Sequence, residues 1–389
     1  MSDSRRRALG AVFGALLWTA GPGLSAVSAQ DQAPGQDQSP GQDQSPGQDQ
    51  GMSQAQKDAQ DPGGVMESLV HVMATVPEDA TTADSLGTVR EGSGIVIDST
   101  GLILTIGYLV VEADRIAVQT ASGTIPADFI GYDGDTGFGL IRARSTQGLR
   151  PMPLGESSPL ETGDHLVVRS ADGDAAQVQV ISRGEFVGSW EYLLDSAVFT
   201  APAFHDFGGA ALIRDGKLVG VGSVVTAFQV PGAGRLPANM FVPIDLLKPI
   251  LQALISSGRS GLPARPWLGV DTAETEQRVV VDSVTPGGPA DNAGLKPGDI
   301  ILDVGRNPVS GIADFYRRVW SIGAAGVNVS LRVLQGDAIR VLTVKSVDRS
   351  QRLKLFPDMP GSTPAGPAAW WQDGRRPGQL PRSSWTKLL

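Results

Sequence analysis

Residues 288–302 read Gly-Pro-Ala-Asp-Asn-Ala-Gly-Leu-Lys-Pro-Gly-Asp-Ile-Ile-Leu, and this stretch specifies three successive elements of structure. Ala290 and Ala293 are spaced to share one helical turn, which Gly294 ends. The Lys-Pro-Gly-Asp sequence that follows is typical of a tight turn. Ile300 then opens an apolar run. The stretch therefore predicts a short helix, a turn and a buried strand.

Further elements follow this stretch towards the carboxy-terminus. The sequence predicts a helix from Asp314 to Trp320 and a strand from Val327 to Val333. Residues 263–349 are therefore expected to form a small α+β domain. A Gly- and Pro-containing linker, residues 259–264, precedes it.

Upstream, from Thr88 to Phe228, short β-rich runs recur every 8 to 12 residues and are separated by Gly, Asp and Ser. This spacing favours an all-β barrel or sandwich. Within residues 211–220, Asp215 and Gly216 stand between two apolar runs, which predicts a β-hairpin with a two-residue turn.

A helix is expected to close this domain, which we place at residues 65–258. Asp245 is its predicted N-cap and Gly258 its end. Apolar residues recur at helical spacing between them: Leu246, Leu247, Ile250, Leu251, Leu254 and Ile255.

The composition of the 389-residue chain limits its function. It has 49 Gly and 27 Pro, about a fifth of the chain against a usual ~12%, so long helical bundles are not expected. A net charge of -9 argues against a nucleic-acid partner, which needs clustered Lys and Arg. The chain has no Cys and three His, so no metal centre and no cofactor are predicted.

The amino-terminus has the features of a signal peptide over residues 1–29. A basic segment, Arg5–Arg7, precedes an apolar run from Ala8 to Trp18, and Val27-Ser28-Ala29 has the small-residue pattern of a cleavage site. We expect cleavage after Ala29 and a periplasmic or secreted protein. An uncleaved anchor is the alternative, although 11 apolar residues fall short of the ~20 that a membrane span needs. The three arginines leave Sec and twin-arginine export both open.

Two segments have the composition of disordered chain. Residues 30–64 form a linker rich in Pro, Gly, Gln and Asp, and residues 33–50 repeat a hexapeptide three times. Residues 350–389 form a basic, Pro-rich tail. Neither has enough large apolar side chains to offset the entropy of ordering the backbone.

The chain resembles the HtrA (Deg) family of exported chymotrypsin-like serine proteases over roughly residues 66–348. The resemblance implies a mostly β protein, with a trypsin-like double β-barrel domain followed by a PDZ domain. The resemblance rests on the order and spacing of six short sequence strings: Gly92-Ser93-Gly94-Ile95-Val96-Ile97-Asp98, Gly101-Leu102-Ile103-Leu104-Thr105, Leu154-Gly155-Glu156-Ser157, Gly163-Asp164, Gly208-Gly209 and Phe241-Val242-Pro243-Ile244.

The same resemblance implies that the catalytic triad is degenerate. The family's His, Asp and Ser positions are occupied here by Tyr108, Gly137 and Phe207. A phenol titrates near ~10, and the other two side chains offer neither a carboxylate nor a nucleophile. His205 replaces the glycine that shapes the family's oxyanion loop. We therefore predict a pseudoprotease with no catalytic residues.

His205 and Asp206 could also be read as a metal or catalytic pair. Neighbouring side chains on an extended chain point to opposite faces, so the pair is interpreted as a polar loop. His71 and His165 lie beside apolar residues and are interpreted as packed or surface histidines.

In the PDZ-like region, the resemblance places a peptide-binding groove at Trp267-Leu268-Gly269-Val270. PDZ domains add a partner's carboxy-terminal strand to a sheet edge and bind its carboxylate through backbone N–H groups. Leu268, Val270, Phe315 and Val319 would line the pocket for the terminal side chain. The alternative is a groove that is blocked or that only packs against the barrel.

The sequence therefore predicts an inactive HtrA-like protein that binds peptides or protein carboxy-termini, as adaptor, chaperone or regulator in envelope protein quality control. One alternative is an active serine endopeptidase with a relocated triad. Another is a subunit that forms a homotrimer or co-assembles with an active paralogue. The chain's own end, Leu388-Leu389, is a candidate ligand for its PDZ groove, and the 39 residues from 351 to 389 are long enough to reach it.

Overall fold

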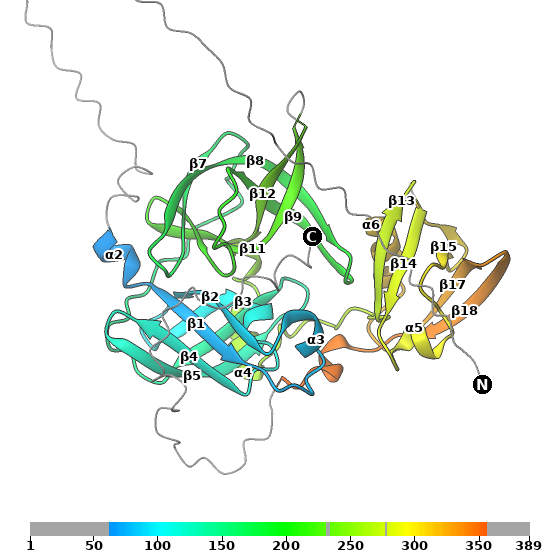
Figure 1. Ribbon diagram of the computed structural model, residues 1–389, viewed down its shortest axis with the longest axis horizontal. Coiled ribbons are helices and arrows are strands. Elements are labelled where there is room, and N and C mark those ends of the chain that lie inside the picture. Colours follow the sequence, from blue (N-terminus) through cyan, green and yellow to red (C-terminus); the bar gives the residue numbers. More distant parts are fainter. Residues whose placement is uncertain (1–61, 231–233, 277, 356–389) are drawn as a thin grey trace, which may run out of the picture. The chain divides into compact units, whose positions relative to one another are not determined.

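Two closed β-barrels form the first part of the protein (Figure 1), whose computed structural model describes residues 62–230, 234–276 and 278–355. The first barrel has the strand order β1-β2-β3-β6-β5-β4. Its strands are β1 (Leu69–Thr75), β2 (Val89–Val96), β3 (Leu102–Ile106), β4 (Arg115–Thr120), β5 (Gly123–Tyr132) and β6 (Phe138–Ala143). Every residue of β3 is buried, as its unbroken apolar sequence requires.

The second barrel has the strand order β10-β11-β12-β9-β8-β7. Its strands are β7 (His165–Arg169), β8 (Ala175–Gly188), β9 (Tyr192–Ala201), β10 (Ala211–Arg214), β11 (Lys217–Val230) and β12 (Gly234–Pro243). The predicted hairpin is confirmed, because Arg214 pairs with Lys217 across a two-residue turn. Asp215 and Gly216 have φ angles of 50° and 70°, which suit a turn with both central residues left-handed.

The third region is a single antiparallel sheet with two helices. Its strand path is β13-β14-β15-β17-β18, and β16 pairs with β15. The elements are β13 (Val270–Thr275), β14 (Arg278–Val284), α5 (Pro289–Asn292), β15 (Ile300–Val304), β16 (Asn307–Pro308), α6 (Ile312–Ser321), β17 (Asn328–Gln335) and β18 (Ala338–Lys345). The helix, turn and strand predicted for residues 288–302 are confirmed, and Gly294 has a φ of 86°. The fold is thus mostly β, with a trypsin-like double barrel before an α+β domain.

The helix expected over residues 245–257 is divided. A 3₁₀ turn, η2 (Ile244–Leu246), precedes α4 (Leu251–Ser257). Asp245 does not cap a helix, because its carboxylate accepts hydrogen bonds from the amides of Ser157 (2.9 Å) and Ser158 (2.7 Å). The predicted N-cap is therefore wrong, since a distant loop uses that carboxylate. Gly258 ends α4 with a φ of 75°, as predicted.

Four short helical segments complete the described elements. They are α2 (Pro62–Met66), α3 (Ala83–Leu86), η1 (Gly107–Leu109) and η3 (Arg349–Arg352). Helix α2 begins two residues before the predicted end of the linker at residue 64.

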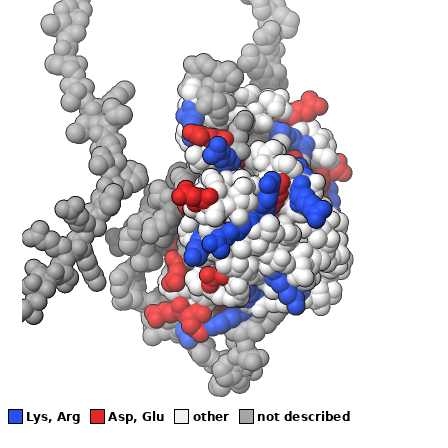
Figure 2. Space-filling view, turned by 90° about the vertical axis from the view of Figure 1, so that its right-hand side faces the viewer, with Lys and Arg blue, Asp and Glu red and all other residues white. Residues whose placement is uncertain are grey.

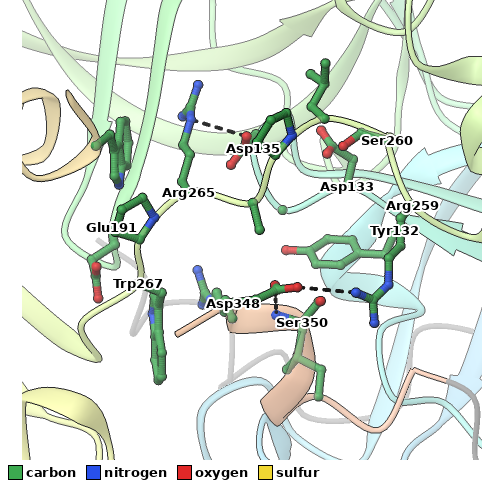
Figure 3. Close-up of a pocket in the computed structure, with 18 residues that line it drawn as sticks. Tyr132, Asp133, Asp135, Glu191, Arg259, Ser260, Arg265, Trp267, Asp348 and Ser350 are labelled. Atoms are coloured by element: carbon green, nitrogen blue, oxygen red, sulfur yellow. Dashed lines mark hydrogen bonds and ion pairs between the residues drawn. The ribbon is translucent and has the colours of Figure 1, made fainter. Parts of the chain in front are cut away.

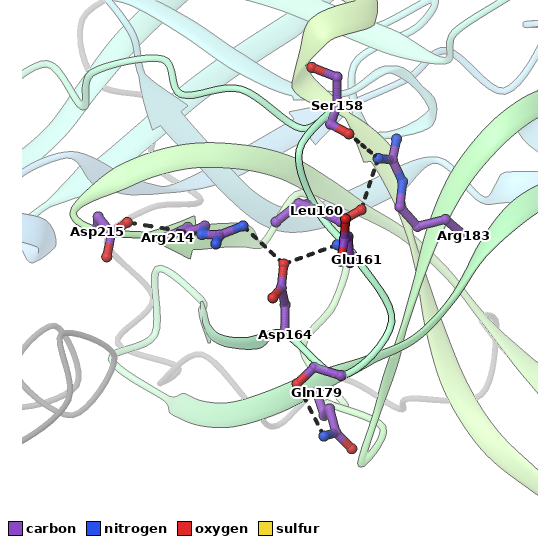
Figure 4. A network of polar contacts seen from close by, with 9 residues as sticks. Ser158, Leu160, Glu161, Asp164, Gln179, Arg183, Arg214 and Asp215 are labelled. Carbon is purple, nitrogen blue, oxygen red and sulfur yellow. Dashed lines mark hydrogen bonds and ion pairs between the residues drawn. The ribbon is translucent and has the colours of Figure 1, made fainter.

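A polar network stabilises the loops of the second barrel (Figure 4). The Asp164 carboxylate accepts hydrogen bonds from the Glu161 amide (3.0 Å) and from Arg214 (2.9 Å) on β10. Arg183 on β8 donates to the Ser158 carbonyl at 2.7 Å. Asp164 thus fixes its loop against β10, and the Gly163 carbonyl, which accepts a hydrogen bond from Gln179, fixes it against β8.

Residues 350–355, which the sequence assigned to the tail, contact the first barrel. The Glu112 carboxylate accepts hydrogen bonds from the amides of Lys354 (3.0 Å) and Thr82 (2.8 Å). Leu355 is buried. The structured region therefore extends past the predicted boundary at residue 350, because a buried carboxylate on the barrel accepts the backbone of this segment.

The predicted signal peptide (1–29), most of the linker and the final residues Leu388 and Leu389 lie outside the described residues. No helix in the described part of the chain has both the length and the apolar character needed to cross a bilayer. On the face that Figure 2 shows, basic and acidic side chains are interspersed.

His71 on β1 links the two barrels electrostatically. Its Nδ1 lies 3.1 Å from Asp172, in the loop after β7, and its Nε2 lies 3.8 Å from Glu91. Burial opposes a charge on this imidazole. The pairing with Asp172 and Glu91 outweighs that effect and raises the pKa of His71 to about 9.

Replacing His71 by Gln should therefore reduce stability in a pH-dependent way. The charged imidazole contributes fully below its unfolded pKa of ~6.5, and this contribution disappears as the pH rises through about 9. Because both carboxylates are partly exposed, we expect a difference of only about 1 kcal/mol. Urea unfolding of both proteins from pH 6 to 10 measures it. His165→Gln, on an exposed residue, is the control, and a difference independent of pH would contradict the assignment.

Candidate functional site

The three positions predicted to correspond to the family's triad lie in segments that contact one another. Tyr108 is in η1, directly after β3. The Gly107 amide donates a hydrogen bond to the Gly137 carbonyl at 2.7 Å, which joins the first two positions. A Cβ at Gly208, the neighbour of Phe207, would lie 3.1 Å from the Tyr108 hydroxyl. The fold therefore brings together residues that are about 30 to 100 positions apart in sequence.

Tyr108 has the chemistry of a structural residue. Its hydroxyl donates a hydrogen bond to the Ser223 carbonyl at 2.8 Å. Burial raises the pKa of this phenol above its ordinary value. A phenol that stays protonated at neutral pH cannot accept a proton from a nucleophile.

Gly137 has a backbone conformation that disfavours a side chain. Its φ is 81°, in the left-handed region where a residue with a Cβ is strained. A Cβ there would lie 3.3 Å from the hydroxyl of Tyr192. That hydroxyl donates a hydrogen bond to the Thr136 carbonyl at 2.7 Å, which fixes this segment in place.

Close backbone contacts fix the loop that contains Phe207. The Ser93 amide donates a hydrogen bond to the Gly208 carbonyl at 2.8 Å. Gly209 has a φ of 73°, and a Cβ on it would lie 1.9 Å from the Ser93 carbonyl oxygen. A Cβ on Gly222 would lie 2.0 Å from the Phe207 carbonyl oxygen. The glycines at these two positions are therefore required by the loop's packing alone.

The side chains of His205 and Asp206 meet, contrary to the sequence-based interpretation. The His205 Nε2 lies 3.0 Å from Asp206 and 3.6 Å from Asp174. The loop is irregular, so the alternation expected of an extended chain does not apply. The three residues could offer ligand atoms within 4.8 Å of one another. They are largely exposed, however, and an exposed acidic cluster of this kind is common without a metal ion.

The residues predicted to line the PDZ groove lie close together in the structure. Leu268, Val270, Phe315 and Val319 are all buried in the same apolar cluster. Gly269 has a φ of 79°, which the turn of the predicted carboxylate loop requires. Trp267 lies at the edge, half-buried, where its backbone pairs with Val347.

The amides of this loop converge on a carboxylate from the second barrel. The amides of Leu268 (2.9 Å), Gly269 (2.7 Å) and Val270 (3.0 Å) donate hydrogen bonds to the side chain of Glu191. Glu191 is in the turn between β8 and β9 and has a φ of 56°. Burial raises the pKa of its carboxyl to about 7, although the three amides and Arg349 oppose that shift.

Sequence reasoning did not identify Glu191. No motif surrounds it, and its partner Leu268 is 77 positions away. Two further residues at this site, Thr272 and Tyr316, were also missed. Both are buried polar residues, and their hydroxyls lie 2.9 Å apart.

A cavity of about 230 Å³ lies beside the Glu191 side chain (Figure 3). Asp135 pairs with Arg265 at 3.2 Å, and the Arg265 guanidinium lies 4.2 Å from the centre of the Trp320 ring. Burial raises the pKa of Asp135 to about 6. Opposite charges thus line the walls of the cavity and pair with each other.

Comparisons with known proteins match two separate parts of the chain. A family model described as a trypsin-like peptidase domain matches residues 92–221, and one described as a PDZ domain matches residues 266–346. The "probable periplasmic serine endoprotease DegP-like" of Bartonella henselae is 27% identical over 272 residues, which cover 65% of this chain and 52% of that protein. The "periplasmic pH-dependent serine endoprotease DegQ" of Escherichia coli is 26% identical over 303 residues, or 73% of this chain and 64% of that one.

The chain thus spans between about half and two thirds of the length of these two relatives. Among solved structures, one titled "HtrA-type protease AlgWS227A with tripeptide" aligns with 74% of this chain and 96% of its own. Its TM-score is 0.47 and its sequence identity is 21%.

Restoring the three triad side chains should not produce an efficient protease. We expect the triple variant Tyr108→His, Gly137→Asp and Phe207→Ser to hydrolyse casein at least ~10³-fold more slowly than an active relative. An Asp at position 137 is strained by a φ of 81°, and His205 still occupies the oxyanion loop. Casein turnover at equal protein concentration measures this. Turnover approaching that of the relative would contradict it and would show that the geometry adapts.

Proposed function

Because the chain is an HtrA-family protein, with a trypsin-like peptidase domain followed by a PDZ domain, we propose that it binds peptides without cleaving them. The family is one of serine endopeptidases. In this chain the barrels would serve as a scaffold, and the PDZ domain would recognise the carboxy-termini of client proteins. The role would be that of an adaptor, chaperone or regulator in envelope protein quality control.

The observation that carries this proposal is the set of three amides at Leu268, Gly269 and Val270. All three donate to one carboxylate within 3.0 Å. Charge-assisted hydrogen bonds of this kind are about twice as strong as neutral ones. A peptide's terminal carboxylate offers the same two oxygens, and the aliphatic cluster beside the loop suits a terminal aliphatic side chain.

Support for catalytic inactivity comes from the residues at the matched triad positions. Tyr108 stays protonated, and its hydroxyl donates a hydrogen bond to the Ser223 carbonyl. Gly137 has no side chain, and Phe207 has no nucleophilic atom. No step of acyl transfer can be assigned to these three groups.

Location and assembly are further parts of the proposal. The signal-peptide pattern ending at Ala29 and the periplasmic names of the relatives support export to the periplasm. We also propose that the tail residues Leu388 and Leu389 are a ligand for the groove, and that assembly occurs as a homotrimer or with an active paralogue.

A fluorophosphonate probe should not label the mature protein. The probe reacts with a serine whose proton is removed by an adjacent base, and position 207 carries a phenyl ring. Intact-mass spectrometry after incubation measures labelling, and an active HtrA-family protease serves as the positive control. Stoichiometric labelling would contradict inactivity and would favour a relocated triad.

Peptide binding should depend on a free terminal carboxylate. We expect an octapeptide with the sequence of residues 382–389 to bind at least ~10-fold more tightly as the acid than as the amide, because the amide lacks the charge that the loop binds. Fluorescence anisotropy measures this, and equal affinities would contradict the proposal. Gly269→Ala should weaken binding, since its φ of 79° strains a side chain, whereas Gly261→Ala, at a φ of 75° outside the loop, is the matched control.

The same assay tests the tail. If Leu388 and Leu389 occupy the groove, a chain ending after Leu355 should bind the octapeptide more tightly than the mature chain. That endpoint retains the hydrogen bond between Lys354 and Glu112. Equal affinities would exclude self-binding by the tail.

A further inference from the structure

The turn between β8 and β9 places the Glu191 carboxylate at the loop where the PDZ domain is proposed to bind the terminal carboxylate of a peptide. Glu191 accepts hydrogen bonds from all three amides of the loop, at 2.7 to 3.0 Å. Gly269 donates the shortest of them, from a backbone with a φ of 79° that a residue with a Cβ adopts only under strain.

The backbone of this turn also pairs with the groove strand. The Thr272 amide on β13 donates a hydrogen bond to the Ser189 carbonyl at 2.9 Å. Ser189 lies two residues before Glu191, and Thr272 lies two residues after Val270. The two segments therefore run antiparallel with matched spacing, which is the geometry of a strand added to a sheet edge.

The apolar pocket of the groove also receives a side chain from this part of the barrel. Leu193, near the start of β9, is buried in the cluster that contains Leu268, Val270, Phe315 and Val319. The barrel thus supplies a carboxylate, a strand segment and an aliphatic side chain, which are the three features of a PDZ ligand.

Helix α6 contacts the same turn from the other side of the groove. The Tyr316 hydroxyl lies 2.8 Å from the Ser189 carbonyl and accepts a hydrogen bond from the Glu191 amide at 3.1 Å. Arg317 forms ion pairs with Glu185 on β8 and Asp195 on β9. Both walls of the groove therefore contact the turn.

Aromatic packing fixes the shape of the turn. The rings of Trp190 and Tyr192 stack with their centres 5.8 Å apart, and Arg349 donates a hydrogen bond to the Trp190 carbonyl. A preorganised segment loses little conformational entropy when it binds, which favours the docked state.

We propose that residues 188–193 are a built-in ligand of the PDZ groove, so that a client carboxy-terminus binds only by displacing Glu191 from the loop. This inference rests on the proposed function, since it presumes that the same groove binds clients. It adds a regulatory state in which the barrel domain holds the groove closed. A client therefore needs both a terminal carboxylate and an aliphatic terminal side chain to compete.

The test uses the full mature chain and its Glu191→Gln variant. Gln keeps the size of the side chain and removes its charge. We expect the variant to bind the octapeptide of residues 382–389 about tenfold more tightly, as the population of open groove rises. Its amides at 268–270 should also exchange with deuterium faster without peptide. Glu156→Ala, which removes an exposed carboxylate of the second barrel, is the control and should change neither quantity.

A second variant opens the groove without altering Glu191. Arg317→Ala removes the ion pairs with Glu185 and Asp195, and Arg317 is partly exposed, so folding should be preserved. It should shift affinity and amide exchange in the same direction as Glu191→Gln.

The outcomes separate the two proposals. Unchanged exchange and unchanged affinity in both variants would overturn the built-in ligand and leave peptide binding intact. Faster exchange with no peptide binding by any form would overturn the proposed function, while the docked turn would remain. Faster exchange together with tighter binding supports both.

Discussion

A carboxylate held by three backbone amides is the interaction on which the PDZ site depends. Removing a carboxylate from water costs several kcal/mol, and here burial raises the pKa of Glu191 to about 7. Hydrogen bonds to a charged group contribute roughly 1.5 to 3 kcal/mol each, so the three amides offset part of that cost, and the pKa stays raised. The converse also holds, because three amides directed at one point need an acceptor there, and a carboxylate is a stronger acceptor than water or a neutral carbonyl. The loop therefore favours a carboxylate, whatever its source.

The barrel domain has a tightly packed backbone at the positions that the resemblance matches to the family's triad, and the side chains there are a tyrosine, a glycine and a phenylalanine. Gly209 and Gly222 are required there because any Cβ would clash with a carbonyl oxygen at about 2 Å. Tyr108 and Gly137 have local structural roles instead. The Tyr108 hydroxyl donates a hydrogen bond to the Ser223 carbonyl, and Gly137 has a positive φ that a residue with a side chain disfavours. A framework can thus persist through packing constraints alone, which is why the fold is a poor guide to catalysis.

Elements with local causes could be predicted from the sequence. The turn at Asp215-Gly216, the end of α4 at Gly258 and the helix, turn and strand over residues 288–302 follow from backbone preferences of a few residues. The resemblance to a known family supplied the arrangement of the domains and the residues of the carboxylate loop.

The errors share a different cause. Asp245 has the residue type and position of a helix cap, but its carboxylate binds amides 87 and 88 positions away. In the sequence, Glu191 is an ordinary residue of a hairpin turn. The fold brings its carboxylate against the amide of Leu268, which is 77 positions further along the chain. A carboxylate binds whichever donors the tertiary structure presents, and these are not encoded beside it.

The affinity of residues 188–193 for the PDZ groove determines how strongly this turn competes with a client peptide. A tethered ligand has an effective concentration near ~1 mM, so an intrinsic dissociation constant of ~1 µM would close the groove about a thousandfold. The turn forms one backbone hydrogen bond with β13, from Thr272 to Ser189, beside its carboxylate contacts. A full peptide strand forms more. An intrinsic constant nearer ~0.1 mM therefore suits the turn better, which reduces a client's affinity only about tenfold. Such a contact keeps the groove mostly closed but lets a client displace it, so it sets a threshold on client affinity and favours clients whose longer strand pairs along β13 beyond Thr272.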